Sequence, residues 1–509
     1  MGLYGKINAE VNAEVIAYQG KVRFDGETIM KRQLSFLLLI IISLSILYGC
    51  NINDGKKAEQ FPDGQKLTGT GQEDTESNTD DIDTQEDSEL QKALKIMYPL
   101  NELQSDFLQF QEYIEMNHPM LFTDKDELAE LFQTQYQKLG NNMNELDFFR
   151  ILMPITAKLN CVHTNLSLSN NLKGLINNSG KVLPLDIKVI DKKAYVYDSC
   201  HSCNIPKGSR ILSINGRSIE EIINIFLNNI SADGFNETKK YLDMNYFFAD
   251  LYYKLIENPD EFTVTYISAE DGQTCNTRIF AAAKEQIANE TGKINSQEGS
   301  GFLYYQEFKN DYAVLTIKSF NFYDDKSRKE FYEFLDDFFE KLDKSKTSKL
   351  ILDLRDNGGG DPYCSSYLFS YLINKEEPYF DKSVKGYYDL TNPIEPKEKN
   401  FTGDLYTLIN GFCVSSTGHL CALLKYHNIG TFYGEESGGS YICSANTKDI
   451  LLSHTNIILY CATVQAEVAV SGLTPGRGII PDHIIMPSIQ DYIDNNDVVM
   501  DYVLENMKQ

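Results

Sequence analysis

A serine at position 415 stands where a nucleophile would be useful. It follows the apolar run 405–409, whose β-forming residues predict a buried strand, and it leads into residues 416–426, whose apolar positions keep a helical spacing. A serine between a strand end and a helix start presents its hydroxyl at an edge, beside the unpaired N–H groups of the first helical turn. Serine is also a preferred helix N-cap, so capping by Ser415 or Ser416 is the alternative interpretation.

Two further stretches carry residue types that belong in catalytic sites. His163 stands where a helical pattern gives way to an extended segment, and it is either functional or a satisfied structural residue. Residues 356–360 read Asp-Asn-Gly-Gly-Gly, and three glycines let a backbone turn sharply and point N–H groups at an anion. A phosphate loop would need Gly-Lys-Ser/Thr, which is absent, so an oxyanion hole is favoured over a plain turn.

The residues around these candidates predict an α/β domain over about residues 300–509. Strands are expected at 312–317, 350–355 and 405–409, and the second of these is nearly continuously apolar, as in buried parallel sheets. Residues 331–342 place four large apolar side chains on one face and predict a helix. Strand, helix, strand and helix in this order indicate a crossover architecture.

Two smaller domains are expected upstream. Residues 91–175 show apolar residues at helical spacing and predict a helical domain that ends near His163. Residues 180–285 show alternating apolar patterns and predict a β domain. Within it, residues 205–219 resemble the central part of a PDZ domain, a fold that binds extended peptides by strand addition. A β domain without a binding role is the alternative.

The N-terminal region predicts export. Residues 30–49 combine a basic start with a short apolar core, as in a signal peptide, and end in Leu-Tyr-Gly before Cys50. This resembles the lipobox of bacterial lipoproteins, in which the cysteine receives lipid; an uncleaved membrane anchor is the alternative. Residues 50–90 are acidic and predict a disordered tether. Residues 1–29 precede the signal and are interpreted as an upstream extension that the native protein lacks, which N-terminal sequencing would test.

Net charge and cysteine content argue against a nucleic-acid partner and against a metal site. A net charge of -26 and a pI near 4.7 argue against a nucleic-acid partner, because no basic stripe is present to neutralise phosphates. Residues 200–203 form a lone Cys-x-x-Cys, and a structural zinc site normally needs a second ligand pair, so no metal site is predicted. Four other cysteines sit in apolar contexts that predict small buried hydrophobes: Cys161, Cys413, Cys421 and Cys461.

Taken in order, six segments resemble the C-terminal processing (tail-specific) serine peptidases and the tricorn protease core. They are 160–164, the PDZ-like segment, 350–360, 407–417, 434–439 and 477–482. The resemblance covers about residues 95–505. It implies a crotonase/Clp-protease-like catalytic domain, preceded by a helical domain and a PDZ-like β domain. It implies neither a metal nor an organic cofactor.

The resemblance also assigns roles. Ser415 matches the nucleophile, and the N–H groups of Ser416, Gly358 and Gly359 match the donors of the oxyanion hole. The processing-peptidase branch uses a lysine from a Gly-Lys pair, and here that pair reads Gly-Gly at 438–439. The chain therefore resembles the tricorn-like branch, in which a histidine is the base.

Two assignments follow for the rest of the site. His163 matches the catalytic histidine, and His419, one turn after the nucleophile, is the rival base. The tricorn-like branch carries a glutamate shortly before its Gly-x-x-Pro-Asp motif, but this chain reads Thr-Pro-Gly-Arg at 474–477. Glu435, Glu436 and Glu467 are possible substitutes, among which the sequence does not choose.

The sequence thus implies a serine endopeptidase of exported or unfolded proteins at the bacterial cell envelope. It would be lipid-anchored through Cys50, on the periplasmic or outer surface. A degenerate family member that binds peptides or glycans without cleaving them is the alternative. A second alternative is transfer or hydrolysis of another acyl group, because one fold can host several chemistries.

Overall fold

A six-stranded sheet organises the C-terminal part of the chain. The computed structural model describes residues 89–199, 203–291 and 303–508, and the strand order of this sheet is β10-β11-β12-β15-β16-β19. The strand at the β10 edge runs antiparallel to its neighbour, whereas all other pairs are parallel. The strands are β10 (Tyr304–Phe308), β11 (Ala313–Ile317), β12 (Lys349–Asp353), β15 (Asp404–Ile409), β16 (Thr431–Gly434) and β19 (His483–Ile484).

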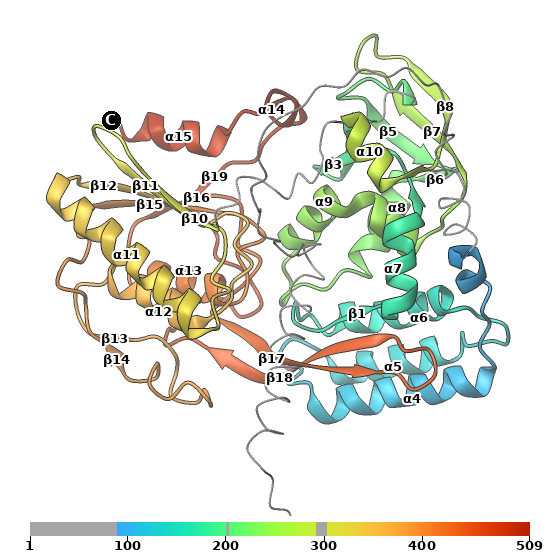
Figure 1. The fold of residues 1–509 in the computed structure, drawn as a ribbon, viewed down its shortest axis with the longest axis horizontal. Helices are drawn as coiled ribbons and strands as arrows, with labels where there is room; N and C mark the ends of the chain where they lie inside the picture. Colours follow the sequence, from blue (N-terminus) through green and yellow to red (C-terminus); the bar gives the residue numbers. More distant parts are fainter. Residues whose placement is uncertain (1–88, 200–202, 292–302, 509) are drawn as a thin grey trace, which may run out of the picture. The chain divides into compact units, whose positions relative to one another are not determined.

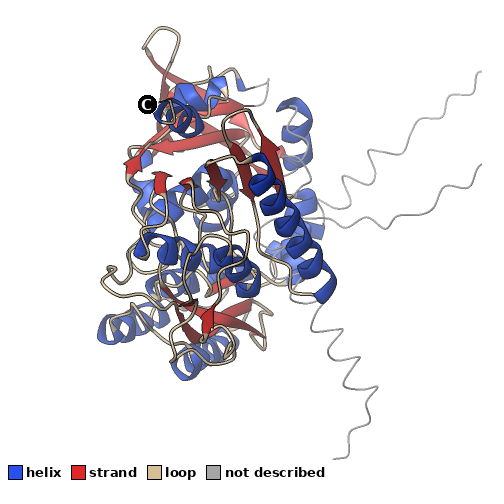
Figure 2. Cartoon of the chain, turned by 90° about the vertical axis from the view of Figure 1, so that its left-hand side faces the viewer, coloured by secondary structure: helices blue, strands red, loops and turns tan. Residues whose placement is uncertain are grey.

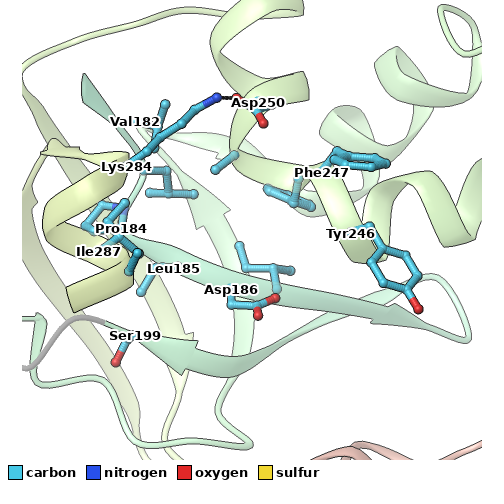
Figure 3. A pocket seen from close by; sticks show the side chains of 15 residues that line it. Val182, Pro184, Leu185, Asp186, Ser199, Tyr246, Phe247, Asp250, Lys284 and Ile287 are labelled. Carbon is cyan, nitrogen blue, oxygen red and sulfur yellow. Dashed lines mark ion pairs between the residues drawn. The ribbon is translucent and has the colours of Figure 1, made fainter. Parts of the chain in front are cut away.

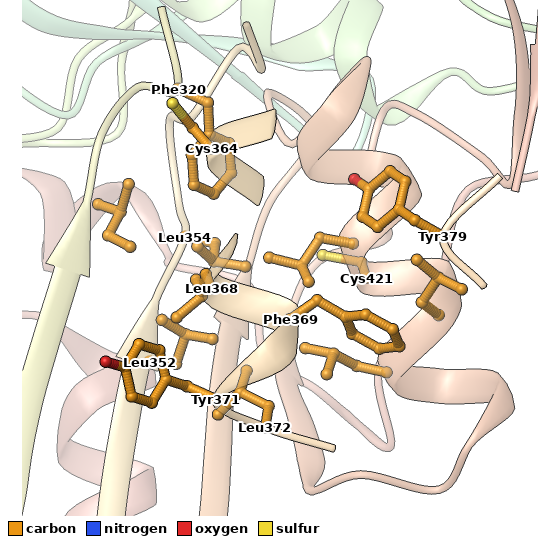
Figure 4. Packing of buried hydrophobic residues seen from close by; sticks show 14 of the residues in the cluster. Phe320, Leu352, Leu354, Cys364, Leu368, Phe369, Tyr371, Leu372, Tyr379 and Cys421 are labelled. Carbon is orange, nitrogen blue, oxygen red and sulfur yellow. The ribbon is translucent and has the colours of Figure 1, made fainter. Parts of the chain in front are cut away.

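Helices cover both faces of this sheet (Figure 1, Figure 2). Side chains alternate along β12, so Leu350 and Leu352 pack with α11, α12 and α13, while Ile351 packs with α15 on the other face. Figure 4 shows the larger of these two cores around Leu352, Phe369 and Cys421. The helices are α11 (Asp325–Ser345), α12 (Pro362–Ser370), α13 (Ser416–Tyr426), α14 (Ile489–Asp494) and α15 (Val498–Asn506).

The predicted α/β architecture is therefore confirmed in this region. β12 is buried on both faces and pairs in parallel with β11 and β15, as its continuous apolar run indicates. The helix predicted at 331–342 is longer, because Asp324 caps its N-terminus and accepts hydrogen bonds from the N–H groups of residues 326 and 327. A short two-stranded sheet, β13 (Glu377–Pro378) with β14 (Pro393–Ile394), completes this region.

The N-terminal part is mostly helical. It consists of α4 (Leu100–Asn117), α5 (Lys125–Tyr136), α6 (Glu145–Lys158), β1 (Asn165–Ser167) and α7 (Asn170–Ser179). Side chains of Asp124 and Asn144 cap α5 and α6 by accepting backbone hydrogen bonds, which fixes where each helix begins. The last turn of α6 leads directly into the segment that carries His163.

The middle part is a β domain with one long helix and two short ones within the described residues. Its main sheet has the order β3-β4-β5-β7-β8, with β6 paired to β5. Its elements are β2 (Lys181–Val182), β3 (Leu185–Ile190), β4 (Lys193–Ser199), β5 (Arg210–Ile214), β6 (Arg217–Ser218), α8 (Ile219–Leu227), α9 (Thr238–Leu255), β7 (Glu261–Ile267), β8 (Thr274–Phe280), β9 (Ala282–Ala283) and α10 (Lys284–Thr291).

A long hairpin joins the C-terminal part to the helical part. Its strands are β17 (Ile442–Leu451) and β18 (Ile458–Glu467), and β18 also pairs with β1, which makes the three-stranded sheet β1-β18-β17. Figure 1 shows the hairpin running beside β1 and α4. Leu452, Ile457 and Leu459 belong to the same hydrophobic core as α4 and α6. The helical part thus closes its core with residues from the far end of the chain.

Several sequence predictions concern residues outside the described ranges. They are the upstream extension, the signal peptide, Cys50, nearly all of the acidic tether, and Cys200. Every described residue falls in a single compact unit. Within the described ranges, no helix has the length and apolar character that crossing a bilayer requires. The four cysteines predicted to be small hydrophobes are buried and unpaired.

Candidate active site

Ser415 occupies the N-cap position of α13 but does not act as a cap. Its side chain accepts no hydrogen bond from the first helical turn, and its backbone has φ 55° and ψ -132°. Residues other than glycine avoid this conformation because of steric strain, which persists only where the surroundings enforce it. The side chain is partly exposed. The junction therefore holds a strained serine whose hydroxyl is not used for structure.

The glycine loop lies directly against this serine. A Cβ atom at Gly359 would stand 2.7 Å from the Cβ of Ser415, so only glycine fits there. Asn357 fixes the loop, because its Oδ1 accepts hydrogen bonds from Gly359 N (2.9 Å) and Thr417 Oγ1 (2.8 Å). The Gly359 N–H is thus engaged within the loop. In the described chain the N–H groups of Gly358 and Ser416 donate to no protein acceptor, which leaves both available to an oxyanion.

The position that corresponds to the lysine of a Ser–Lys dyad has no room for a side chain. A Cβ atom at Gly439 would lie 2.8 Å from the Cα of Val414 and 3.0 Å from the backbone N of Ser415. Real Cβ atoms avoid such contacts with backbone, so a lysine here would require the backbone beside Ser415 to move.

His163 lies in the turn between α6 and β1, and the hairpin holds its backbone. The carbonyl of His163 accepts a hydrogen bond from Thr447 Oγ1 at 3.3 Å, and Thr164 Oγ1 accepts one from the N–H of Ala462 at 3.0 Å. The ring Nδ1 is buried without a hydrogen-bond partner in the described chain. Burial lowers the pKa of His163 to about 4, so the imidazole is neutral near pH 7 and can accept a proton.

His419 lies on the first turn of α13 and donates its backbone N–H to the carbonyl of Ser415 at 2.9 Å. Burial, and secondarily the charge of His163, lower the pKa of His419 to about 3. His419 itself is 3% exposed, and its Nε2 lies 3.5 Å from Cys443 Sγ, as expected for a packed residue. No hydrogen bond joins His163 to the Ser415 hydroxyl in the described chain; such contacts often form only when substrate is bound.

The three glutamates predicted as substitutes for the missing acid interact with residues other than His163. Glu436 forms a two-pronged ion pair with Arg477, with distances of 2.9 and 2.6 Å. Glu467 accepts a hydrogen bond from a neighbouring glutamine on β18. Burial, and secondarily the charge of Asp356, raise the pKa of Glu435 to about 7. In the described structure none of them hydrogen-bonds to His163.

A carboxylate that the sequence analysis did not single out lies beside His163. One ligand-type atom each of Cys161, His163 and Asp233 lie within 4.8 Å of one another, a donor set that could also hold a divalent metal such as zinc. Asp233 belongs to the loop between α8 and α9 and is 3% exposed. Asp-Gly at 233–234 is a common turn dipeptide, so the local sequence carries no catalytic signal.

A separate cavity lies in the β domain (Figure 3). Its volume is about 310 Å³, and its walls come from β3, the middle of α9 and α10. Lys284 and Asp250 form an ion pair of 2.6 Å at its edge. It is lined by Leu185 and Phe248 among other apolar residues and contains none of the residues around Ser415.

The comparisons with known proteins agree with this architecture. Residues 311–482 match the family model described as peptidase family S41. The chain resembles the solved structure of mature CPAF complexed with lactacystin, with a TM-score of 0.57 and 13% identity over 80% of this chain and 97% of that chain. The crystal structure of mature CPAF gives a TM-score of 0.54 and 13% identity over 79% of this chain and 99% of that chain. At this identity the likeness shows the fold. A search of curated proteins gave no match.

Fold and family model together define a serine peptidase. The domain that carries Ser415, the glycine loop and the parallel sheet is the matched region. This domain, residues 311–482, belongs to peptidase family S41, the tail-specific peptidases that the sequence resemblance indicated. The predictions of family and enzyme class are therefore confirmed.

Proposed function

We propose that this chain is a lipid-anchored endopeptidase that cleaves exported or unfolded proteins at the bacterial cell envelope, with Ser415 as nucleophile and His163 as base. The observation that carries the proposal is the conformation of Ser415. Its backbone is strained, its hydroxyl caps no helix, and a glycine loop packs directly against it. A structure retains such strain where the geometry serves a purpose.

The proposed mechanism assigns each step to one of these groups. Ser415 Oγ attacks the carbonyl carbon of the scissile peptide bond while His163 takes the hydroxyl proton. The N–H groups of Gly358 and Ser416 stabilise the negatively charged oxygen of the tetrahedral intermediate, an effect worth about 3 kcal/mol per donor in comparable enzymes. The protonated His163 then donates its proton to the leaving amine. Water, activated by the same imidazole, hydrolyses the acyl-enzyme.

The location and substrate class rest on the sequence. The signal peptide and lipobox at 30–50 support export and anchoring, and the acidic segment that follows would hold the peptidase away from the bilayer. The cavity in the β domain lies along β3, the edge strand of its sheet. In a PDZ-like domain, such an edge takes up an extended peptide by strand addition. We therefore place a substrate-holding site there, apart from Ser415.

The test is proteolysis of an unfolded protein such as casein by the detergent-solubilised chain. We expect cleavage by the parent and a loss of at least about 10³-fold in Ser415→Ala and His163→Ala. His454→Ala is the matched control for the second variant, because His454 is a partly exposed histidine at the tip of the hairpin. Peptide binding without cleavage by the parent would favour the non-catalytic alternative, and cleavage that survives both substitutions would reject the site.

A further inference from the structure

We propose that Asp233 is the positioning carboxylate of His163, so that the catalytic triad is Ser415, His163 and Asp233. The proposal rests on the proposed function, because it assigns a third member to the same site. It places the acid on the loop between α8 and α9 of the β domain. None of the three glutamates named from the sequence occupies this role.

Two unsatisfied polar atoms belong to the residues of this cluster. In the described structure, His163 Nδ1 and Asp233 Oδ2 are both buried and both lack a hydrogen-bond partner. Asp233 and His163 each contribute an atom to the group whose members lie within 4.8 Å of one another. A buried polar group without a partner costs about 1–3 kcal/mol, so a hydrogen bond between these two atoms would satisfy both.

The backbone holds Asp233 at this place from both sides. Its other oxygen, Oδ1, accepts a hydrogen bond from the N–H of Val162 at 2.9 Å, which fixes the carboxylate beside the residue preceding His163. The next residue, Gly234, donates its N–H to the carbonyl of Asn160 at 2.9 Å. The carboxylate is thereby locked to the segment that carries the base, as a positioning group must be.

The same loop also contacts the peptidase domain. The N–H of Phe235 donates to the carbonyl of Gly476 at 2.7 Å, and Asn236 Nδ2 donates to the carbonyl of Ser437 at 2.9 Å. Gly234 packs so closely on Gly476 that a Cβ atom there would stand 2.2 Å from its Cα. The loop therefore contacts both the segment that carries His163 and the peptidase domain, and Asp233 lies on this loop.

The pair of His163 and Asp233 accounts for the proton and the charge that arise in the reaction. When His163 takes the Ser415 proton on Nε2, the imidazolium carries a proton on Nδ1 as well, and an ionised Asp233 accepts that hydrogen bond and stabilises the positive charge. The carboxylate does not itself take up the proton. Without it, the imidazolium would form in a buried site with no compensating charge.

The experiment compares Asp233→Asn with the parent. Asparagine keeps the shape and removes the charge, so we expect kcat to fall by about 100-fold or more while KM changes little. Asp233→Glu should restore part of kcat. A chelator should leave the parent fully active; inhibition would assign the cluster to a metal and overturn the proposal.

Asp106→Asn is the matched control. Asp106 is also a fully buried aspartate, and it accepts three hydrogen bonds from His454 and Thr455 at the hairpin tip. We expect this control to lower the melting temperature without lowering kcat. If Asp233→Asn behaves in the same way, with kcat unchanged, Asp233 is structural and the proposal fails.

A second readout does not depend on turnover. The chemical shift of His163 Nδ1 can be followed by NMR, and His163→Gln identifies its resonance among the seven histidines. We expect this chemical shift to change in Asp233→Asn, because the carboxylate that would hydrogen-bond to Nδ1 has been replaced by a neutral amide. An unchanged value overturns the proposal even if the parent cleaves no substrate. Inactivity of the parent with a shifted value would reject the proposed function alone.

Discussion

The backbone strain at Ser415 costs stability at the position where the proposed function needs a reactive hydroxyl. The left-handed backbone of this residue points the hydroxyl away from the helix it precedes, where it would otherwise form a cap. Thr417 and Gly418 donate their N–H groups to the carbonyl of Val414 instead. Backbone hydrogen bonds alone therefore start the helix, and the Ser415 hydroxyl is left available for reaction.

Replacing Ser415 by glycine should stabilise the protein and abolish cleavage. Glycine adopts positive φ without strain, so the free energy of unfolding should rise by about 1 kcal/mol, or a few degrees in melting temperature. Thermal unfolding monitored by circular dichroism measures the change. Ser416→Gly is the control, since Ser416 is helical and glycine there should be destabilising. A drop in stability in Ser415→Gly would contradict the assignment of strain.

Glu435 predicts a pH dependence of stability. Burial and the charge of Asp356 raise its pKa to about 7 in the folded protein, above the value of about 4.5 in the unfolded chain. The folded state therefore binds this proton more tightly, and stability is lost as the pH rises through about 7. Glu435→Gln cannot ionise, so it should gain roughly 1–2 kcal/mol over the parent at pH 8, allowing for partial exposure.

Chemical denaturation of the two proteins at pH 4 and pH 8 measures this difference. At pH 4 the glutamate is protonated in both states, so the two curves should nearly coincide. Glu467→Gln serves as the control, because Glu467 is also partly buried but accepts a hydrogen bond from Gln465 on the same strand. Equal stability of the parent and Glu435→Gln at both pH values would show that the carboxylate remains solvated.

The sequence predicted part of this site at the level of residues. Ser415 and the glycine loop could be located because strand ends, glycines and helix starts have local signatures. His163 could be singled out only through the family resemblance, since a lone histidine carries no local signature of function. Asp233 had no signal, because its environment is formed by Val162 and Asn160, more than seventy residues away, and only the folded chain brings them together.

At the scale of elements, the hairpin β17–β18 holds the segment that carries His163, the proposed base. It supplies the only strand partner of β1 within the described structure and the hydrogen bonds that hold residues 163 and 164. The sequence predicted the parallel strands of the main sheet, whose apolar runs are continuous. It did not predict this pairing, because the register Asn165 with Tyr460 joins positions almost 300 residues apart.

Thr164→Val tests that role. Valine keeps the shape but removes the oxygen that accepts the N–H of Ala462, leaving a buried donor without a partner at a cost of about 1–3 kcal/mol. Because this residue adjoins the base, kcat should fall as well, which casein cleavage and thermal unfolding together would detect. Thr463→Val is the control: its hydroxyl donates to Asn446 within the exposed part of the hairpin. Similar effects of both substitutions would reject the positioning role.

At the scale of the whole molecule, the chain combines an acidic composition with a predicted lipid anchor. A net charge of -26 disfavours adsorption to anionic lipid headgroups, so membrane attachment would depend on the acyl chains alone. The domain order inferred from the sequence places this anchor at the opposite end of the chain from the peptidase domain.

Cys50→Ala should therefore release the protein from the membrane fraction. Fractionation of cells and incorporation of labelled palmitate would measure the change, and both should be lost together. Cys275→Ala is a matched control, since Cys275 is a free and partly exposed cysteine in the β domain. Membrane association that survives Cys50→Ala would indicate the uncleaved anchor instead.

The pairing of β1 with β18 also sets the order in which the peptidase can mature. A ribosome delivers His163 nearly 300 residues before Tyr460, so the turn that carries the base waits for its partner strand until the chain is almost finished. Under the proposed function, a translation product that ends before β18 would lack the strand that holds the segment of His163. Only a nearly complete chain would then become an active protease.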